Sequence, residues 1–91
     1  MTVSATTSLR VLYFAWLRER VGVGEESFAL PEGIATVGAL IEWLRLRGPG
    51  HAAAFAPGRI VRCAVNQDFA GPEAAIHPGD EVAFFPPVTG G

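Results

Sequence analysis

Lysine is absent from this 91-residue sequence, and all seven basic residues are arginines. A P-loop needs the lysine of its Gly-x-x-x-x-Gly-Lys motif, so nucleotide binding by such a loop is excluded. The arginines form no cluster, and the net charge of −2 leaves no basic surface for nucleic acid. The sequence therefore offers neither an ATP site of the P-loop type nor a nucleic-acid interface.

Cysteine and long apolar runs are scarce as well. The single Cys63 cannot form an internal disulfide, so nothing indicates an oxidising compartment. The longest apolar run, residues 11–17, is far shorter than the roughly 20 residues that a transmembrane helix needs. Residues 1–8 contain no basic residue and no cleavage pattern of a signal peptide. We therefore expect a soluble, cytoplasmic protein with no membrane partner.

Charged residues make up only 18% of the chain, against about 25% in typical globular domains. Hydrophobic residues make up 49%, which excludes a disordered tail protein. A chain of this length supports one domain with one core. The low charge content suggests that part of its surface is covered by a partner.

Hydrophobic periodicity and turn residues predict an α+β order of elements. The predicted elements are strands at 9–16 and 25–30, a helical turn at 17–21, helices at 36–47 and 51–56, and strands at 59–65 and 80–85. Residues 66–76 are expected to be irregular. We interpret residues 1–8 as a disordered leader, 9–85 as the domain and 86–91 as an extended tail.

The main helix carries the clearest pattern. Its apolar residues recur at i, i+3, i+4 and i+7, namely Val37, Leu40, Ile41 and Leu44. Thr36 is a suitable N-cap, and Gly48-Pro49-Gly50 ends the helix. Two strands, a long helix and two later strands predict a β-grasp, ubiquitin-like fold, with one mixed sheet and the helix on one face. A ferredoxin-like fold would need a second full helix before the last strand, which residues 66–76 do not supply.

The usual catalytic constellations are missing. His51 and His77 have no cysteine or carboxylate cluster at metal-ligand spacing, so we expect no metal site. Glu25-Glu26 and Asp80-Glu81 point to opposite faces of their strands, which makes them solvated charges rather than an acid/base pair. Cys63 shares the apolar face of its strand and has no basic partner on it, so we expect an inert, buried thiol.

The last six residues remain to be explained. Pro86 and Pro87 end the last strand, because neither can donate to a sheet ladder. From there the chain can extend by roughly 20 Å, with Val88 and Thr89 leading to a tip without side chains at Gly90 and Gly91. Such a tip can thread a channel as narrow as a backbone. The group that it delivers is the α-carboxylate of Gly91.

Three segments resemble the small subunit of molybdopterin synthase. The most specific is the C-terminal stretch 79–91, GDEVAFFPPVTGG, and the other two are Ala64-Val65-Asn66-Gln67 and the opening 11–15 with Arg18-Glu19. The resemblance implies a β-grasp sulfur carrier in molybdenum-cofactor biosynthesis, acting as one subunit of a sulfurtransferase. No cofactor bound by this chain is implied.

The same resemblance implies a reaction sequence and a set of partners. An E1-like adenylyltransferase uses ATP to adenylate the carboxylate of Gly91, and a sulfur donor (a sulfurtransferase or cysteine desulfurase) converts it to a thiocarboxylate. The tail then enters the large synthase subunit, where sulfur passes to cyclic pyranopterin monophosphate. In the family the synthase is a heterotetramer with two small subunits.

The docking surface follows from strand alternation and from the resemblance. If Phe84 lies in the core, Phe85 points to the opposite face, beside the tail. Phe14 alternates with the core residues of the first strand, and Phe69 has no predicted strand partner. We predict that Phe14, Phe69 and Phe85 form one exposed apolar surface with Arg18 at its rim. The alternative is ordinary burial of all three rings in the core.

Two other functions fit the sequence. One is a β-grasp sulfur carrier of another pathway, such as synthesis of the thiamine thiazole, although the Phe-Phe-Pro-Pro-Val tail argues against it. The other is a ubiquitin-like modifier or interaction module that never carries sulfur. Oxygen-to-sulfur exchange at Gly91 would favour a carrier, and an isopeptide adduct would favour a modifier.

Overall fold

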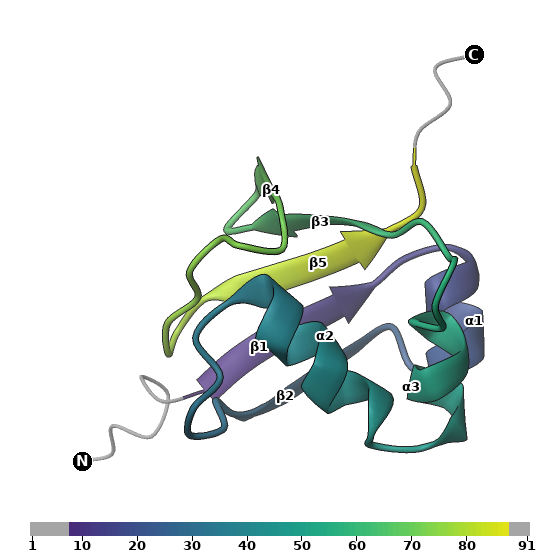
Figure 1. The fold of residues 1–91 in the computed structure, drawn as a ribbon, viewed down its shortest axis with the longest axis horizontal. Helices are drawn as coiled ribbons and strands as arrows, with labels where there is room; N and C mark the ends of the chain where they lie inside the picture. The colour runs from purple at the N-terminus through teal and green to yellow at the C-terminus, as the bar shows by residue number, and fades with distance from the viewer. Residues whose placement is uncertain (1–7, 88–91) are drawn as a thin grey trace.

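The computed structural model of the protein describes residues 8–87, which form a five-stranded mixed sheet and three helices (Figure 1). Along the chain the elements are β1 (Ser8–Tyr13), α1 (Trp16–Val21), β2 (Glu25–Ala29), α2 (Val37–Arg45), α3 (Pro49–Ala54), β3 (Arg62–Val65), β4 (Asp68–Ala70) and β5 (Glu81–Phe85). The predicted α+β class and β-grasp arrangement are confirmed.

The first and last strands lie side by side in the middle of the sheet, whose order is β2-β1-β5-β3-β4. β1 and β5 are parallel, with Tyr13 opposite Phe84, and the other neighbouring strands are antiparallel. Because parallel strands end at the same edge, the chain leaves β5 close to the place where it passes from β1 into α1 (Figure 1).

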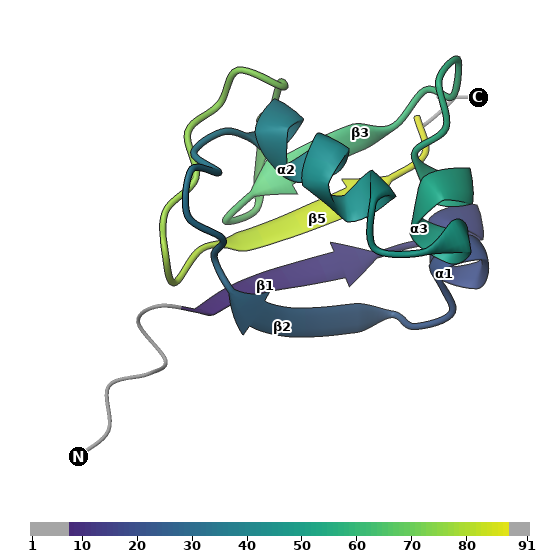
Figure 2. The same ribbon diagram turned by 60° about the horizontal axis from the view of Figure 1, so that its bottom comes forward.

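The three helices cover one face of the sheet, with α2 across it and α1 and α3 at one end (Figure 2). Apolar side chains from both layers meet there and lose almost all contact with solvent. The largest of them are Leu9, Val11, Tyr13, Leu17, Val37, Leu40, Leu44, Val82 and Phe84. Each such side chain contributes about 1.5–3 kcal/mol by leaving water. No helix in residues 8–87 covers the opposite face, which we call the outer face.

The main helix begins where the sequence predicts. The Oγ1 atom of Thr36 accepts a hydrogen bond from the N–H of Ala39 at 3.2 Å, which caps α2. The predicted apolar stripe lies against the sheet, with Val37, Leu40 and Leu44 fully buried. α2 ends at Arg45, two residues before the predicted end.

The first strand is shorter than predicted, because residues 9–16 do not all extend. β1 ends at Tyr13, and Ala15 adopts φ 57° and ψ −133°. The N–H of Leu17 bonds the carbonyl of Phe14 at 3.2 Å, so residues 14–17 form a turn of the type II′ kind. Trp16 therefore starts α1 and does not belong to the strand. A conformation of this type usually requires glycine and costs an alanine about 1–3 kcal/mol.

The second helix and the strand after it also differ from the prediction. α3 spans 49–54 rather than 51–56, because Pro49 and Gly50 form its first turn instead of only ending α2. Proline suits that position, since its missing N–H would have no partner there. β3 begins at Arg62, three residues after the predicted start at 59.

The segment predicted as irregular, 66–76, contains a short strand. Asn66 and Gln67 both have positive φ, 52° and 74°, and form a two-residue hairpin loop. The loop turns the chain back on β3, and β4 pairs with β3 over three residues. Asparagine tolerates this conformation better than most residues, but the pair lacks the glycine that usually signals such a hairpin.

Candidate functional site

The outer face of the sheet is apolar at the edge where β1 and β5 end. Strand register places Leu12, Ala83 and Ala64 in one row across β1, β5 and β3. Phe69 on β4 lies opposite Ala64 and continues this row, and in the next row Phe85 lies opposite Arg62. The outer face therefore presents aliphatic and aromatic side chains near the root of the tail.

The predicted aromatic residues are on the surface and not in the core. Phe69 is 85% exposed and Phe14 is 48% exposed, while Phe85 is half-buried on the opposite side of β5 from Phe84. The rings of Phe69 and Phe85 lie 5.9 Å apart, whereas Phe14 lies at the end of the neighbouring β1. Ordinary core burial of all three is therefore wrong. Arg18 is exposed on α1.

The root of the tail lies beside this apolar surface. Pro86 and Pro87 follow β5 directly and are half-buried. The N–H of Phe14 donates to the carbonyl of Phe84 at 3.1 Å, which holds the ends of β1 and β5 together. Val88, Thr89, Gly90 and Gly91 lie outside the described residues, so the tail's reach remains a prediction.

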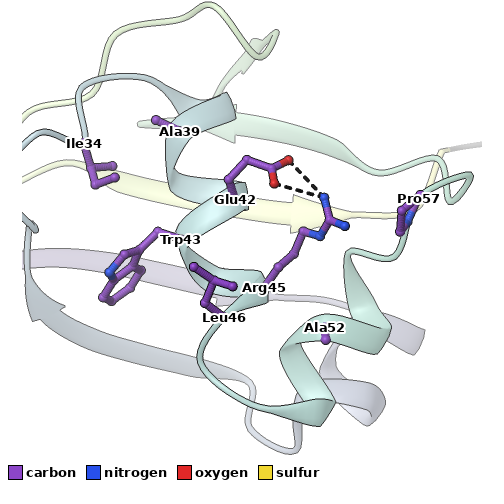
Figure 3. A pocket seen from close by; sticks show the side chains of 8 residues that line it. All are labelled: Ile34, Ala39, Glu42, Trp43, Arg45, Leu46, Ala52 and Pro57. Carbon is purple, nitrogen blue, oxygen red and sulfur yellow. Dashed lines mark hydrogen bonds and ion pairs between the residues drawn. The ribbon is translucent and has the colours of Figure 1, made fainter.

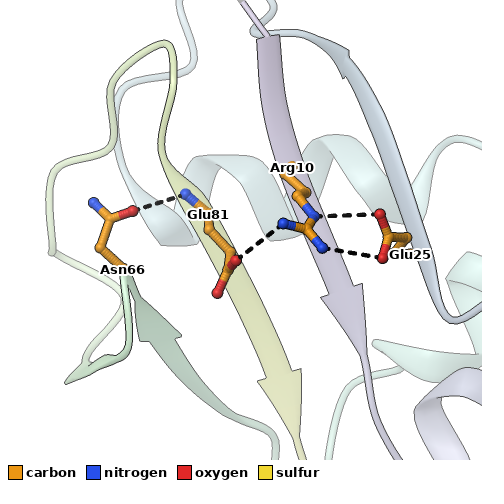
Figure 4. Close-up of polar contacts among 4 residues, drawn as sticks. All are labelled: Arg10, Glu25, Asn66 and Glu81. Atoms are coloured by element: carbon orange, nitrogen blue, oxygen red, sulfur yellow. Dashed lines mark hydrogen bonds and ion pairs between the residues drawn. The ribbon is translucent and has the colours of Figure 1, made fainter.

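The opposite end of the outer face is polar. Arg10 pairs with Glu25 (Nε–Oε2 3.2 Å) and with Glu81 (Nη1–Oε1 3.5 Å), and Asn66 accepts the N–H of Glu81 at 3.0 Å (Figure 4). Asn66 also donates to a carboxylate oxygen of Asp80 at 3.0 Å. These contacts connect the β3–β4 turn to β5, β5 to β1, and β1 to β2. They hold these elements in fixed positions relative to one another at this end of the sheet. The sequence places Asn66 only in a segment that carries the family resemblance, because its hydrogen-bond partners are distant in the chain.

A cluster of polar side chains lies at the border of the core. The hydroxyl of Tyr13 donates to Glu26 Oε2 at 2.5 Å, and His51 Nε2 lies 2.7 Å from the same oxygen. Arg47 lies 3.6 Å from the other oxygen of this carboxylate. Burial alone would raise the pKa of Glu26, but hydrogen bonds from Tyr13 and His51 and the charges of His51 and Arg47 lower it. Burial, together with Glu26, raises the pKa of Tyr13, so its phenol stays protonated.

We expect Glu26→Gln to lower the free energy of unfolding by about 1–3 kcal/mol near neutral pH, because it removes a charge that three groups contact. The folded-state pKa of Glu26 lies below its unfolded value, so this stabilisation is present above the unfolded pKa and disappears as pH falls through the folded pKa. The difference between wild type and variant should therefore shrink in acid. Urea unfolding at a series of pH values measures it.

Glu25→Gln is the matched control for this prediction. Glu25 is the neighbouring residue and also pairs with an arginine, but about half of its side chain is exposed. Exposed ion pairs contribute about 0–1 kcal/mol, so Glu25→Gln should change stability little. Equal losses in the two variants, with the same pH dependence, would contradict a specific role of Glu26.

Cys63 is buried, as predicted. It is 7% exposed, and its Sγ donates to the carbonyl of Ala70 at 3.2 Å. Burial first, and then the negative charge of Glu73, raise the pKa of the Cys63 thiol. Among residues 8–87 no three side chains of histidine, cysteine, aspartate or glutamate gather as metal ligands would. Within the same residues, every helix is too short or too polar to span a membrane.

An open groove of about 680 Å³ lies on the helix side (Figure 3). Trp43 and the exposed Leu46 form its apolar wall, and Glu42 and Arg45, both on α2, form an ion pair beside it at 3.0 Å. Trp43 packs on Phe28, with ring centroids 4.9 Å apart, as expected for a residue at the edge of the core. The groove holds none of the predicted site residues.

Comparison with known proteins agrees with the predicted fold. The sequence model of the ThiS family matches residues 11–91. The chain is 43% identical over 83 residues to the molybdopterin synthase sulfur carrier subunit of Haemophilus influenzae, covering 91% of this chain and 99% of that protein.

Two solved structures are similar over most of their length. The putative molybdopterin converting factor subunit 1 of Pyrococcus furiosus superimposes with a TM-score of 0.74 at 33% identity, covering 90% of this chain and 99% of that one. The small archaeal modifier protein 1 of Haloferax volcanii superimposes with a TM-score of 0.70 at 29% identity, covering 92% of this chain and 99% of that one.

Proposed function

This chain belongs to the ThiS family, and from that membership we propose that it is the sulfur carrier subunit of a molybdopterin synthase. The observation that carries the proposal is the 43% identity, over 91% of the chain, to a relative with that name. The terminal Gly90-Gly91 and the apolar surface at the root of the tail support it.

The chemistry would begin at the Gly91 carboxylate. A terminal carboxylate has a pKa of about 3.3–3.7, so it is ionised at neutral pH and is a poor electrophile. We propose that an E1-like adenylyltransferase joins it to the AMP part of ATP and releases pyrophosphate. A sulfur donor, a sulfurtransferase or cysteine desulfurase, then attacks through the terminal sulfur of its persulfide and displaces AMP, and a thiol reductant cleaves the resulting acyl disulfide to leave a thiocarboxylate. ATP is bound by that partner and not by this chain.

The thiocarboxylate would then deliver its sulfur inside the large synthase subunit. A tail without side chains at its last two residues can enter a channel as narrow as a backbone. The acceptor is cyclic pyranopterin monophosphate, and the product carries a dithiolene. One terminus holds one sulfur, so two loaded chains are needed for each dithiolene. A heterotetramer with two small subunits suits this stoichiometry.

The outer face would dock on the partner. Phe69 and Phe85 are in ring contact, Phe14 is exposed at the same edge of the sheet, and Arg18 is exposed on α1. Exposed apolar surface beside the reactive tail is typical of an interface. Docking there would hold the root of the tail at a fixed distance from the partner's active site.

The likeness to the archaeal modifier favours a second candidate, a ubiquitin-like modifier. Both functions need an activated C-terminus, but they differ in the nucleophile that attacks it. A modifier forms an isopeptide bond with a lysine of a target. Because this chain has no lysine, its activated terminus has no ε-amine of its own chain to react with.

The test is mass spectrometry of the intact protein after incubation with the activating enzyme, ATP and a sulfur donor. We expect a mass increase that corresponds to replacement of one oxygen by sulfur, and none without ATP. Arg62 is the last basic residue, so trypsin releases the terminus as the single peptide 63–91, in which the change can be located. An isopeptide adduct on another protein, with no sulfur exchange, would instead support the modifier.

A further inference from the structure

The arginines fall into two groups by their partners. Arg10, Arg45 and Arg47 each lie within 3.6 Å of a glutamate carboxylate. Among the described residues, four arginines have no such partner, and these are Arg18, Arg20, Arg59 and Arg62. α1, the α3–β3 loop and the start of β3 carry these four and meet at the edge of the sheet where β5 ends (Figures 1 and 2).

Arg62 lies within the apolar surface itself. It is exposed on β3, directly across from Phe85 on β5. It lines a shallow cleft of about 280 Å³ together with Phe69, Phe85, Cys63 and Ala70. Arg62 is the only charged residue of this cleft within the described residues. A partner that covers Phe69 and Phe85 therefore removes water from the Arg62 guanidinium as well.

Arg59 is held in place on the loop before β3. Its guanidinium carbon lies 4.9 Å from the centroid of the Trp16 ring, a cation–π contact at the first residue of α1. Stacking on an aromatic ring occupies the flat face of a guanidinium and leaves its N–H edge free. That edge can bind a carboxylate through two parallel hydrogen bonds. Trp16 is the first residue of α1, so this donor belongs to the end of the sheet where β1 passes into α1.

We propose that Arg59 and Arg62 form a carboxylate-binding rim at the end of the sheet where β5 ends, and that the large synthase subunit supplies an acidic side chain opposite each. The proposal rests on the proposed function, because it takes the docking partner from it. Burying a guanidinium without a counter-charge is strongly unfavourable, so a surface that fits Phe85 and Phe69 must also pair with Arg62. Arg59, at the margin, would mainly attract the partner over distance and speed association.

The experiment measures the affinity of the full chain for the purified large subunit by calorimetry at several salt concentrations. We expect Arg62→Gln to weaken binding about 10- to 100-fold. Arg59→Gln should weaken it less and mostly through slower association. In both variants the affinity should depend less on salt than in the wild type. Arg45→Gln is the matched control, since it removes the same charge from α2, on the helix side, and should bind like the wild type.

The variant Phe85→Ala shows whether a negative result contradicts only the proposed rim or also the proposed docking on the large subunit. If Phe85→Ala weakens binding but Arg62→Gln binds within about twofold of the wild type, the outer face is still the docking surface but the rim is wrong. If neither variant binds more weakly, both the rim and the proposed docking are wrong. A loss in Arg62→Gln that keeps the wild-type salt dependence would also overturn the rim, because packing and not charge would then explain it.

Discussion

Deletion of Gly91 should abolish sulfur transfer while leaving the fold unchanged. Shortening the tail by one residue draws its carboxylate back by about 3.3–3.6 Å. A displacement of about 1 Å can already cost a reaction about 100-fold, so the loss should exceed that factor in both adenylation and transfer. The measurement is the rate of oxygen-to-sulfur exchange at the C-terminus, followed by the rate of dithiolene formation with the large subunit.

Gly91→Ala is the matched control for the deletion. It keeps the carboxylate in register and adds only a methyl group, so it reports the width of the channel and not the length of the tail. We expect a smaller loss than for the deletion. The unfolding free energy of both variants should equal that of the wild type. Sulfur transfer that survives the deletion would contradict the carrier mechanism.

Replacement of Phe85 by glutamate should weaken the complex with the large subunit about 30-fold or more, which corresponds to about 2 kcal/mol or more for a central aromatic residue. Folding should be retained, because Phe85 points away from the core and Arg62 lies directly across the strand pair. Opposite charges at such positions stabilise a sheet slightly. Calorimetric titration and thermal unfolding of the same samples measure both effects.

Two further variants are controls for the effect of Phe85→Glu on binding and on folding. Leu46→Glu changes an apolar residue that is 85% exposed on the helix side, and it should leave binding unchanged. Phe84→Ala removes a fully buried ring from the neighbouring position and should cost about 3–5 kcal/mol of stability. If Phe85→Glu unfolds the protein as Phe84→Ala does, then Phe85 is a core residue and the docking surface is wrong.

The outer face shows which side-chain positions can be predicted from the alternation of residues along a strand and which cannot. The pattern around Arg10 and Phe14 placed both side chains away from the core, and Phe14 is indeed exposed. It could not identify the neighbours of Phe69, because β4 was not predicted. The hairpin loop at Asn66-Gln67 lacks glycine, so the local sequence gave no sign that Asp68–Ala70 would pair with β3. The ring contact of Phe69 with Phe85 depends on that pairing.

The polar contacts were the hardest to foresee. Glu26 and Glu25 look alike in the sequence, which predicts a solvated charge at each, and for Glu26 that prediction is wrong. In the structure Glu25 pairs with Arg10 at the surface, whereas Glu26 contacts Tyr13, His51 and Arg47 beside the core. Nothing local distinguishes the two carboxylates, because the partners of Glu26 come from elements that only folding brings together.

The sequence by itself determined the order of the strands other than β4 and of the helices, the buried stripe of α2, the burial of Cys63 and the terminal Gly90-Gly91. These features depend on local periodicity, turn residues and chain ends, which can be read without knowing any partner. Only the tertiary structure decided the lengths of β1 and α3, the existence of β4, the different partners of Glu25 and Glu26, and the position of Arg62 opposite Phe85 at the root of the tail. The physical reason is that these features arise from contacts between residues far apart in the chain, whose register is fixed when β1 and β5 pair at the centre of the sheet.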